Sequence, residues 1–291
     1  MSEGIKTQLG VIGGSGVYQM DGVEIIKEHD LDTPFGKPSD KITEAKIEGR
    51  TVFFIPRHGK GHRLLPQEVP YRANIYAMKK LGVTHLLAVS AVGIMKEEIN
   101  PGDFVVPDQV FDRTKGMRDS TFFGNGIAGH VTFADPFCDE MRSIAIKAAK
   151  TKGAKVHETG AYVCMEGPQF STRSESVFYR DTLKPAVIGM TAVPEVKLAR
   201  EAELSYAVIA TATDYDCWHE TEEDVSVEAV IAVLKANAEM ANSIVKEVAT
   251  SLPETSSAHS LSAAQFAIMT NPSLIPQKTK EDLELLYGKY W

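Results

Sequence analysis

Residues 8–16 read QLGVIGGSG, an apolar run that breaks abruptly into glycines and one serine. The run is typical of a buried first strand that ends in a turn. Backbone N–H groups in such a turn can point at an anion, so the turn is a candidate phosphate site. Two kinds of phosphate fit this position: one that is part of a dinucleotide, and one that is free to react.

The rest of the chain alternates between strand and helix patterns. Apolar or alternating runs predict a hairpin over 43–56 and strands over 84–93, 155–165, 186–190 and 205–214. Apolar residues at helical spacing predict helices over about 71–81, 136–152, 173–182, 193–203 and 227–248. Interleaved strands and helices indicate an α/β fold with a largely internal sheet.

No internal repeat and no shift in composition interrupts residues 1–250, which we interpret as one domain. Residues 251–260, SLPETSSAHS, have the composition of a linker. LSAAQFAIM at 261–269 predicts a short apolar helix, and a proline-rich tail follows it. The tail carries Leu283, Leu286 and Tyr287, so we expect it to pack on the domain or on a neighbouring subunit.

The composition argues against several classes of partner. The 291 residues carry a formal net charge of −8, so the chain lacks the basic surface expected for nucleic-acid binding. No apolar stretch reaches membrane-spanning length, and the N-terminus lacks the long apolar segment of a secretory signal. Cys138, Cys164 and Cys217 are far apart and form no CxxC pair, which favours reduced thiols over disulfides or zinc. We therefore expect a cytoplasmic protein with no membrane partner.

A dinucleotide site fits the glycine turn poorly. The glycines at 10, 13, 14 and 16 do not form G-x-G-x-x-G before a clear helix. The acidic residue expected about twenty positions further on would be Asp32. Asp32 lies in DLDTPFGKPSD, which lacks strand character. A dinucleotide-dependent oxidoreductase is therefore disfavoured.

Polar groups that can bind an anion recur at four predicted strand ends. Ser15 lies in the glycine turn, and Arg57 and His58 follow the apolar run TVFFI. Arg57 could donate two parallel hydrogen bonds, and His58 is a second donor. Ser90 lies in VSAVG after the next strand, and Thr191 follows AVIGM. Each group alone is compatible with an ordinary turn or a solvated loop, but their recurrence points to an anion site.

Two carboxylates follow the strand at 205–214. Asp214 and Asp216 are two residues apart, so in extended backbone they would share a face. Carboxylates this close disfavour double ionisation, which raises the pKa of one of them and suits a general acid. A turn or a helix cap is the alternative interpretation of the same residues.

Taken in order, these motifs resemble the 5′-methylthioadenosine phosphorylase family, within the trimeric purine nucleoside phosphorylases. The matching segments are IGGSG (12–16), DTPFGKPSD (32–40), RHGKGH (57–62), YRANI (71–75), EEINPGD (97–103), DPFC (135–138), EGPQFSTRSE (166–175), MTAVPEV (190–196) and ATDYDCW (212–218). The resemblance runs from about residue 8 to 250, with a fainter match at AQFAIM (264–269). It implies a single domain with a central mixed β-sheet surrounded by helices.

The resemblance also implies the reaction. Free inorganic phosphate would attack the anomeric carbon of methylthioadenosine and release adenine and methylthioribose 1-phosphate. Phosphate is then a co-substrate, and neither a metal nor an organic cofactor is needed. Met190 would lie beneath the ribose and Phe170 against the base. The family's phosphate contacts fall on Ser15, Arg57, His58, Ser90, Ala91 and Thr191.

The remaining family positions concern catalysis and specificity. Asp214 would give a proton to the departing adenine, and Asp216 would accept from its exocyclic amine. Relatives that act on 6-oxopurines carry asparagine at the position of Asp214, so DYD favours a 6-aminopurine. Val227 and Thr172 match positions that shape the 5′ pocket. His130 and the AQFAIM segment match parts that reach the adjacent subunit's site, which implies a homotrimer.

Three other functions remain open at this point. A purine nucleoside phosphorylase of broader or 6-oxopurine specificity would share most of these motifs. A nucleoside hydrolase would use water and would need no phosphate pocket, which the combination of Arg57, Ser15 and Thr191 disfavours. A binding protein without enzymatic activity would need none of the carboxylate chemistry.

Overall fold

A computed structural model describes residues 4–13, 22–221 and 224–291. Ser15 lies outside these ranges. Within them, eleven strands form one sheet with the path β3-β4-β5-β2-β6-β11-β10-β8. A branch leaves β6 through β12, which pairs with β7, which in turn pairs with β9. The sheet is mixed: β6 is parallel to β2 and β12 and antiparallel to β11. This confirms the predicted α/β fold with a central mixed sheet.

The strands of this sheet are β2 (Leu9–Gly13), β3 (Val23–His29), β4 (Ile42–Ile47), β5 (Arg50–Pro56), β6 (His85–Ile94), β7 (Phe104–Val105), β8 (Gln109–Arg113), β9 (Val156–His157), β10 (Ala161–Met165), β11 (Val187–Gly189) and β12 (Ser205–Asp214). The α-helices are α1 (Tyr71–Lys80), α2 (Asp139–Thr151), α3 (Arg173–Phe178), α4 (Ala192–Glu201), α5 (Val227–Ser251) and α6 (Gln277–Tyr287). No helix in the described ranges has both the length and the apolar character needed to cross a bilayer.

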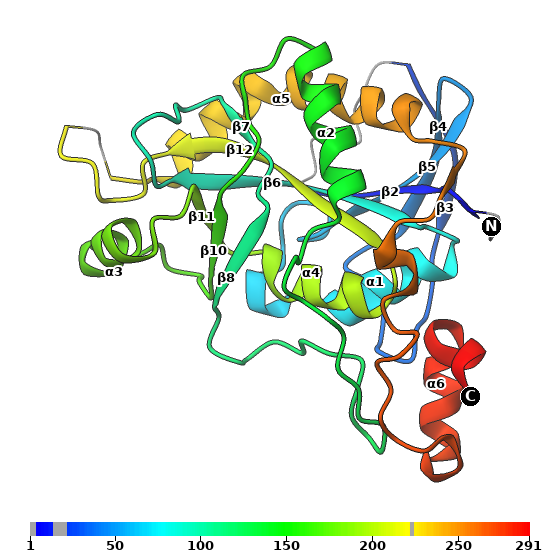
Figure 1. Ribbon diagram of the computed structural model, residues 1–291. Coiled ribbons are helices and arrows are strands. Elements are labelled where there is room, and N and C mark those ends of the chain that lie inside the picture. Colours follow the sequence, from blue (N-terminus) through cyan, green and yellow to red (C-terminus); the bar gives the residue numbers. More distant parts are fainter. Residues whose placement is uncertain (1–3, 14–21, 222–223) are drawn as a thin grey trace.

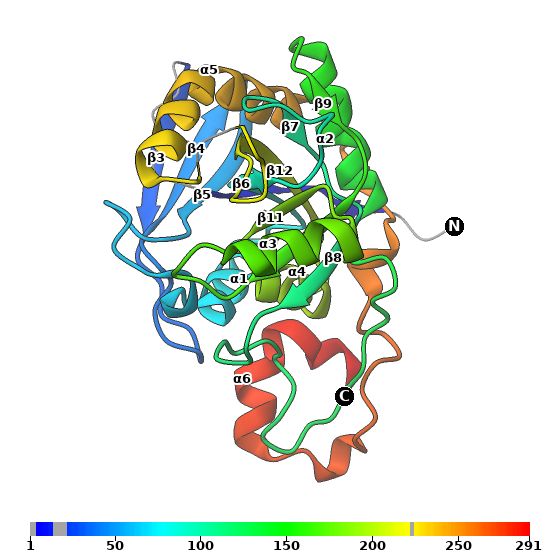
Figure 2. The same ribbon diagram turned by 90° about the vertical axis from the view of Figure 1, so that its left-hand side faces the viewer.

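Helices cover both faces of the sheet (Figures 1 and 2). Helices α1 and α4 lie on one face and α2 and α5 on the other, with α6 beyond α1. Side chains alternate between the two cores along each strand, as the period of two requires. Val11 packs with the α2 and α5 side, for example, and Ile12 with the α1 and α4 side. Burial on both faces explains why the central strands read as continuous apolar runs.

Two predictions for the C-terminal part are wrong. Residues 261–269 do not form an apolar helix: a 3₁₀ helix (His259–Ser262) is followed by turns, and Ile268 forms a β-bridge with Gly129. Residues 251–260 are not a free linker, because β13 (Thr255–Ser256) pairs with β1 (Ile5–Lys6) near the N-terminus. Both segments are held by partners far away in the sequence, which local composition does not reveal.

The C-terminal tail packs on its own chain. Leu283, Leu286 and Tyr287 of α6 are buried, and the Tyr287 ring stacks on Phe123 at 5.2 Å between centroids. The tail after α6 reaches Glu203, a carboxylate that is 1% exposed. Glu203 accepts from Lys289 Nζ at 2.6 Å, from the Tyr290 hydroxyl at 2.6 Å and from the Ala264 N–H at 3.0 Å. Glu203 therefore holds both the last residues and the start of the 264–269 segment on the body of the protein.

Candidate active site

The candidate residues converge on one stretch of β6, residues 89–93. β12 runs parallel to it, and its register sets Ala210 beside Ser90 and Asp214 beside Gly93. β11 is antiparallel to β6, with Ile188 opposite Gly93. The chain that leaves β11 therefore runs back along β6, toward Ser90 and Ala91. This topology brings together segments that lie more than a hundred residues apart in the sequence.

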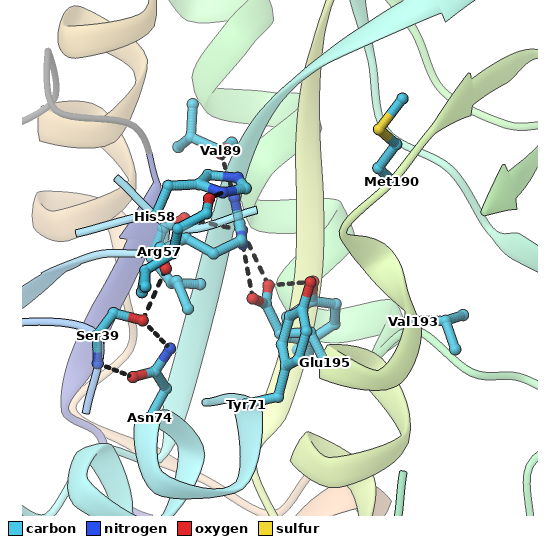
Figure 3. Close-up of polar contacts among 12 residues, drawn as sticks. Ser39, Arg57, His58, Tyr71, Asn74, Val89, Met190, Val193 and Glu195 are labelled. Carbon is cyan, nitrogen blue, oxygen red and sulfur yellow. Dashed lines mark hydrogen bonds and ion pairs between the residues drawn. The ribbon is translucent and has the colours of Figure 1, made fainter. Parts of the chain in front are cut away.

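Arg57 is a deeply buried charged group of the site, at 2% exposed. Its Nε donates to Glu195 Oε2 at 2.7 Å and its Nη2 to Glu195 Oε1 at 2.9 Å, a bidentate ion pair with the start of α4 (Figure 3). Nη1 donates to the carbonyl of Val89 at 3.2 Å, and Nη2 also to that of Ile12 at 3.3 Å. One side chain thus joins the ends of β5, β2 and β6 to α4.

The backbone of Arg57 is held as firmly as its side chain. The Ser39 hydroxyl donates to the Arg57 carbonyl at 2.7 Å and itself accepts from Asn74 Nδ2 at 2.8 Å (Figure 3). Burial alone would lower the pKa of Arg57, but the charge of Glu195 and the bonds to it raise the pKa overall. Arg57 is therefore a permanent cation whose orientation the protein sets in advance.

The pair with Glu195 limits what Arg57 can offer to an anion. A guanidinium has five N–H groups, and four of them are used by Glu195, Val89 and Ile12. Among the described residues, one N–H of Nη1 has no partner. The parallel pair of donors that we expected to meet an anion instead meets Glu195. An anion at this edge of the sheet would receive a single hydrogen bond from Arg57.

Two predicted donors, Ser90 and Thr191, lie on the segments that Arg57 joins: Ser90 follows Val89 on β6, and Thr191 precedes α4. The Ser90 hydroxyl is buried and has no hydrogen-bond partner in the described part of the chain. A buried hydroxyl without a partner costs free energy, so this one points to a ligand. Thr191, at 9% exposed, caps no backbone group although it stands at the N-terminal end of α4. Ala91 follows Ser90 on β6 and pairs with Thr211 of β12.

His58 is a neutral imidazole in this site. Burial and the neighbouring charge of Arg57 lower the pKa of His58 to about 4. Its Nδ1 lies 2.9 Å from the Leu64 carbonyl, which can only accept, so Nδ1 carries the proton. The other ring nitrogen, Nε2, is then an acceptor. His58 can therefore receive a hydrogen bond from a protonated oxygen, but it adds no positive charge near pH 7.

The two aspartates end β12 in a way that differs from our expectation. A register shift lies between Ala212 and Asp214, and Asp216 adopts a left-handed backbone with φ of 54°. The prediction that both carboxylates share a face of an extended strand is therefore wrong. Asp214 Oδ1 instead accepts from the Asp216 N–H at 2.9 Å, and Asp214 Oδ2 lies 2.7 Å from the Thr213 hydroxyl. Gly93 leaves room for Ile188 of the neighbouring strand β11, because a β-carbon at position 93 would lie 2.9 Å from Ile188 Cγ2.

Burial raises the pKa of both aspartates. For Asp214 the charge of Asp216 also raises the pKa, but less than burial does, so proximity is the smaller cause. The Thr213 hydroxyl also donates to the Val92 carbonyl at 3.1 Å. When its one proton goes there, its oxygen can accept a proton from a protonated Asp214. Asp216 Oδ2 is buried without a partner in the described part of the chain, so it can accept from a ligand.

The two residues predicted to contact the nucleoside, Met190 and Phe170, lie on the segments that follow β11 and β10. The Met190 carbonyl accepts from Arg118 Nη1 at 2.6 Å, and Gly167 leaves space for the Met190 sulfur. Phe170 is 42% exposed, in a loop whose Ser171 carbonyl accepts from Cys217 Sγ at 3.3 Å. Cys217 is the neighbour of Asp216, so this loop lies beside the carboxylates.

The two residues predicted to set specificity occupy helix ends near the same place. The Thr172 hydroxyl caps α3, accepting from the Glu175 N–H at 3.2 Å and donating to the Glu175 carboxylate. Val227 begins α5 and is 58% exposed. Two residues earlier, the Val225 N–H donates to the Asp216 carbonyl at 2.8 Å, which ties the start of α5 to the carboxylates.

His130 does not lie near the other candidate site residues of its own chain. It lines a cavity of about 300 Å³ together with Ser120, Thr121, Lys197 and Glu201. Glu201 ends α4, whereas Thr191 precedes it, so about 15 Å of helix separate the two. The His130 N–H donates to the Ala267 carbonyl at 2.9 Å, which brings His130 next to Phe266, a side chain that is 91% exposed.

Several residues of the site were not predicted. Glu195 and Tyr206, whose hydroxyl donates to Glu195 Oε1 at 2.8 Å, complete the Arg57 network. Arg118 pairs with Glu166 at 2.6 Å and donates to the carbonyls of Met190 and Val193. One signal was available for Glu195, because it interrupts an apolar run, AVPEV, and buried charges need a partner. Within the described ranges, no three potential metal ligands converge.

Comparison with known proteins identifies the family to which the chain belongs. The model of a family described as "Phosphorylase superfamily" matches residues 8–250. An S-methyl-5′-thioadenosine phosphorylase of Geobacter sulfurreducens is 53% identical over 282 residues, which are 97% of this chain and 98% of that protein. Its counterpart from Koribacter versatilis is 50% identical over 99% of this chain and 98% of its own length.

Solved structures of similar chains show the same architecture. A methylthioadenosine phosphorylase from an Antarctic soil metagenomic library has a TM-score of 0.90 and 44% sequence identity, covering 97% of this chain and 99% of that one. The methylthioadenosine phosphorylase of Schistosoma mansoni in complex with adenine has a TM-score of 0.80 at 40% identity, covering 84% of this chain and 91% of its own.

We expect Glu195→Ala to lower the free energy of unfolding by about 3–5 kcal/mol, because it leaves the buried Arg57 cation without its carboxylate. Urea denaturation measures the change. Glu97→Ala is the matched control, since Glu97 pairs with Arg180 at 3.0 Å but its side chain is 63% exposed, and it should change stability little. Equal stability of Glu195→Ala and wild type would show that the pair does not hold Arg57 in place.

Proposed function

The chain belongs to the phosphorylase superfamily, and from this premise we propose that it catalyses the phosphorolysis of 5′-methylthioadenosine. Phosphate forms a bond to the anomeric carbon as the bond to the base breaks, which yields adenine and 5-methylthioribose 1-phosphate. The enzyme is a pentosyltransferase of nucleoside salvage, like its named relatives at about half identity over nearly their whole length. The observation that supports the reaction best is the unpartnered, buried Ser90 hydroxyl on β6, beside the strand β12 whose end carries the half-buried Asp214 and the buried Asp216.

At the phosphate end, the site holds the nucleophile mainly through hydrogen bonds. Arg57 and Glu195 together carry no net charge, so the remaining Nη1 N–H acts as a directed donor. The hydroxyls of Ser90 and Thr191 supply further donors, and we include Ser15 and the backbone at Ala91. Neutral His58 accepts a hydrogen bond from the protonated oxygen of hydrogen phosphate through Nε2. Such preset donors fix the attacking oxygen without reorganisation of the protein.

The sugar passes through a cation that resembles an oxocarbenium ion, and the phosphate beneath it stabilises the charge by position. Met190 directly precedes Thr191, and Arg118 Nη1 donates to its carbonyl, which fixes its backbone next to the phosphate end of the site. We assign Met190 to the underside of the ribose and Phe170 to the base. Val227 and Thr172 would border the 5′ substituent, where an apolar wall favours a methylthio group over a hydroxyl.

At the base end, Asp214 is the general acid. Adenine is a poor leaving group as an anion, so a proton delivered to its five-membered ring speeds its departure. Burial already raises the pKa of Asp214, and Thr213 can accept from the protonated form. Asp216 Oδ2 then accepts from the exocyclic amine. This pair favours 6-aminopurines. In a 6-oxopurine the 6-oxygen, which is a hydrogen-bond acceptor, would face the Asp216 carboxylate, which is also an acceptor.

We also propose that the enzyme is a homotrimer whose subunits share their sites. His130 lies away from the other candidate residues of its own chain, beside the exposed Phe266 and Met269, which are 91% and 73% exposed. An exposed aromatic and a methionine on one bridged segment suit a contact with a second copy. The three cysteines are free and buried, in keeping with the reducing cytoplasm.

The reaction class predicts that adenine release requires phosphate. Purified protein should convert methylthioadenosine to adenine only when phosphate is added, with one sugar 1-phosphate formed per adenine. Chromatography of the base and phosphorus NMR of the sugar measure both products. Equal release of adenine in phosphate-free buffer would instead identify a hydrolase.

Asp214→Asn should lower kcat/KM for methylthioadenosine by about 10²-fold or more, since an amide cannot give up a proton. Methylthioinosine should lose far less, because the new amide can donate to a 6-oxopurine. Asp216→Asn is the comparison variant and should weaken adenine use by a smaller factor. Equal losses for both substrates in Asp214→Asn would show that Asp214 only stabilises the turn, by accepting a hydrogen bond from the Asp216 N–H.

A further inference from the structure

Tyr162 packs against the segment that leads from β11 to Thr191 of the proposed phosphate site. It belongs to β10, which pairs with β11 so that Tyr162 lies beside Val187. The side chain is fully buried, and a β-carbon at position 189 would overlap its hydroxyl. The phenol therefore packs flush against the backbone of Gly189, two residues before Thr191. Glycine is needed there to admit the hydroxyl.

The hydroxyl of Tyr162 has no hydrogen-bond partner in the described ranges. Its two tyrosine neighbours in this network do have one: Tyr206 donates to Glu195 at 2.8 Å, and Tyr71 accepts from Arg118 at 3.4 Å. A buried tyrosine hydroxyl normally finds a partner, because leaving it unpaired costs free energy. Because the Tyr162 hydroxyl lies beside a candidate ligand site, we expect it to gain a hydrogen-bond partner when the ligand binds.

Thr191 is the neighbouring residue that can provide this hydrogen-bond partner. The Tyr162 hydroxyl packs against Gly189, two residues before Thr191, and the side chain and N–H of Thr191 oppose the rise that burial causes in the pKa of the phenol. Neither makes a hydrogen bond of normal geometry with the hydroxyl as the two stand. A rotation of the Thr191 side chain about its Cα–Cβ bond moves its oxygen relative to the phenol without moving the backbone.

We propose that Tyr162 is a positioning residue of the phosphate site: when phosphate is bound, its hydroxyl donates to Thr191 Oγ1 and selects the rotamer in which Thr191 donates to the phosphate. The inference rests on the proposed function, because it takes Thr191 as a phosphate ligand. The threonine hydroxyl then both accepts and donates, and each bond polarises the other. Tyr162 itself touches no substrate.

Two properties separate this role from simple packing. The phenol ring fills the space behind β11 whether or not the hydroxyl is present, so Tyr162→Phe keeps the packing. The hydroxyl has no hydrogen-bond partner in the described ranges, so its removal should leave the thermal stability of the protein without phosphate unchanged or slightly higher. Its loss should appear only when phosphate binds.

The test compares Tyr162→Phe with wild type in steady-state kinetics and in thermal unfolding with and without inorganic phosphate. We expect the KM for phosphate to rise about three- to tenfold, the factor that corresponds to one net hydrogen bond between neutral groups. The KM for methylthioadenosine should stay within twofold. The rise in Tm that phosphate produces should shrink, while the Tm of the free protein does not fall.

Tyr287→Phe is the matched control. It also deletes a buried tyrosine hydroxyl that has no partner in the described ranges, but in α6, away from β6 and β11. It should leave the phosphate KM and the phosphate-induced Tm shift unchanged. Thr191→Val provides a second test, since a hydroxyl that acts through Thr191 has no further effect once Thr191 has lost its own. The double variant Tyr162→Phe/Thr191→Val should match Thr191→Val.

An unchanged phosphate KM in Tyr162→Phe would overturn the proposal, as would additive losses in the double variant. A Tm of the free variant several degrees below wild type would also overturn it, because the hydroxyl would then be engaged before phosphate binds. Failure of the proposed function itself looks different. In that case wild type would show no phosphate requirement, and no phosphate KM would exist to compare.

Discussion

The bidentate ion pair between Arg57 and Glu195 is the interaction on which the site depends. It is buried on both sides, and it joins the end of β5 to the start of α4 while Arg57 also binds the carbonyls of Ile12 and Val89. These contacts set the spacing of β2, β5 and β6 at the edge where Ser90 lies. Because α4 begins with the chain that carries Thr191, the same pair also places Thr191 against β6.

The pair has a chemical consequence as well as a structural one. A buried carboxylate beside the arginine cancels its charge, so the site selects phosphate by directed donors more than by net attraction. At the other end, burial raises the pKa of Asp214 and Asp216 above the ordinary value of an aspartate, which favours the protonated form of a general acid. The two ends of the site thus differ: hydrogen-bond donors are oriented at the phosphate, and a carboxyl pair with raised pKa lies at the base.

Much of this arrangement could be predicted from sequence, because strand ends and polar residues are local features. The fold and the strands that carry Ser90 and Asp214 follow from short patterns. The burial of Arg57 does not, because the same short segment is compatible with a solvated loop. The partner of Arg57 could not be predicted, since Glu195 lies 138 residues further along the chain. The same limit applies to residues 261–269, whose conformation depends on a bridge to Gly129, and to the turn that separates Asp214 from Asp216.

A crystal structure of the protein with phosphate and an unreactive analogue of methylthioadenosine tests the central claim most directly. The account predicts that the Nε and Nη2 groups of Arg57 stay on Glu195. Phosphate oxygens should lie about 2.7–3.2 Å from Arg57 Nη1, the Ser90 hydroxyl and the Thr191 hydroxyl. The account would be contradicted by an Arg57 side chain that has left Glu195 and binds phosphate through Nε and Nη2 together.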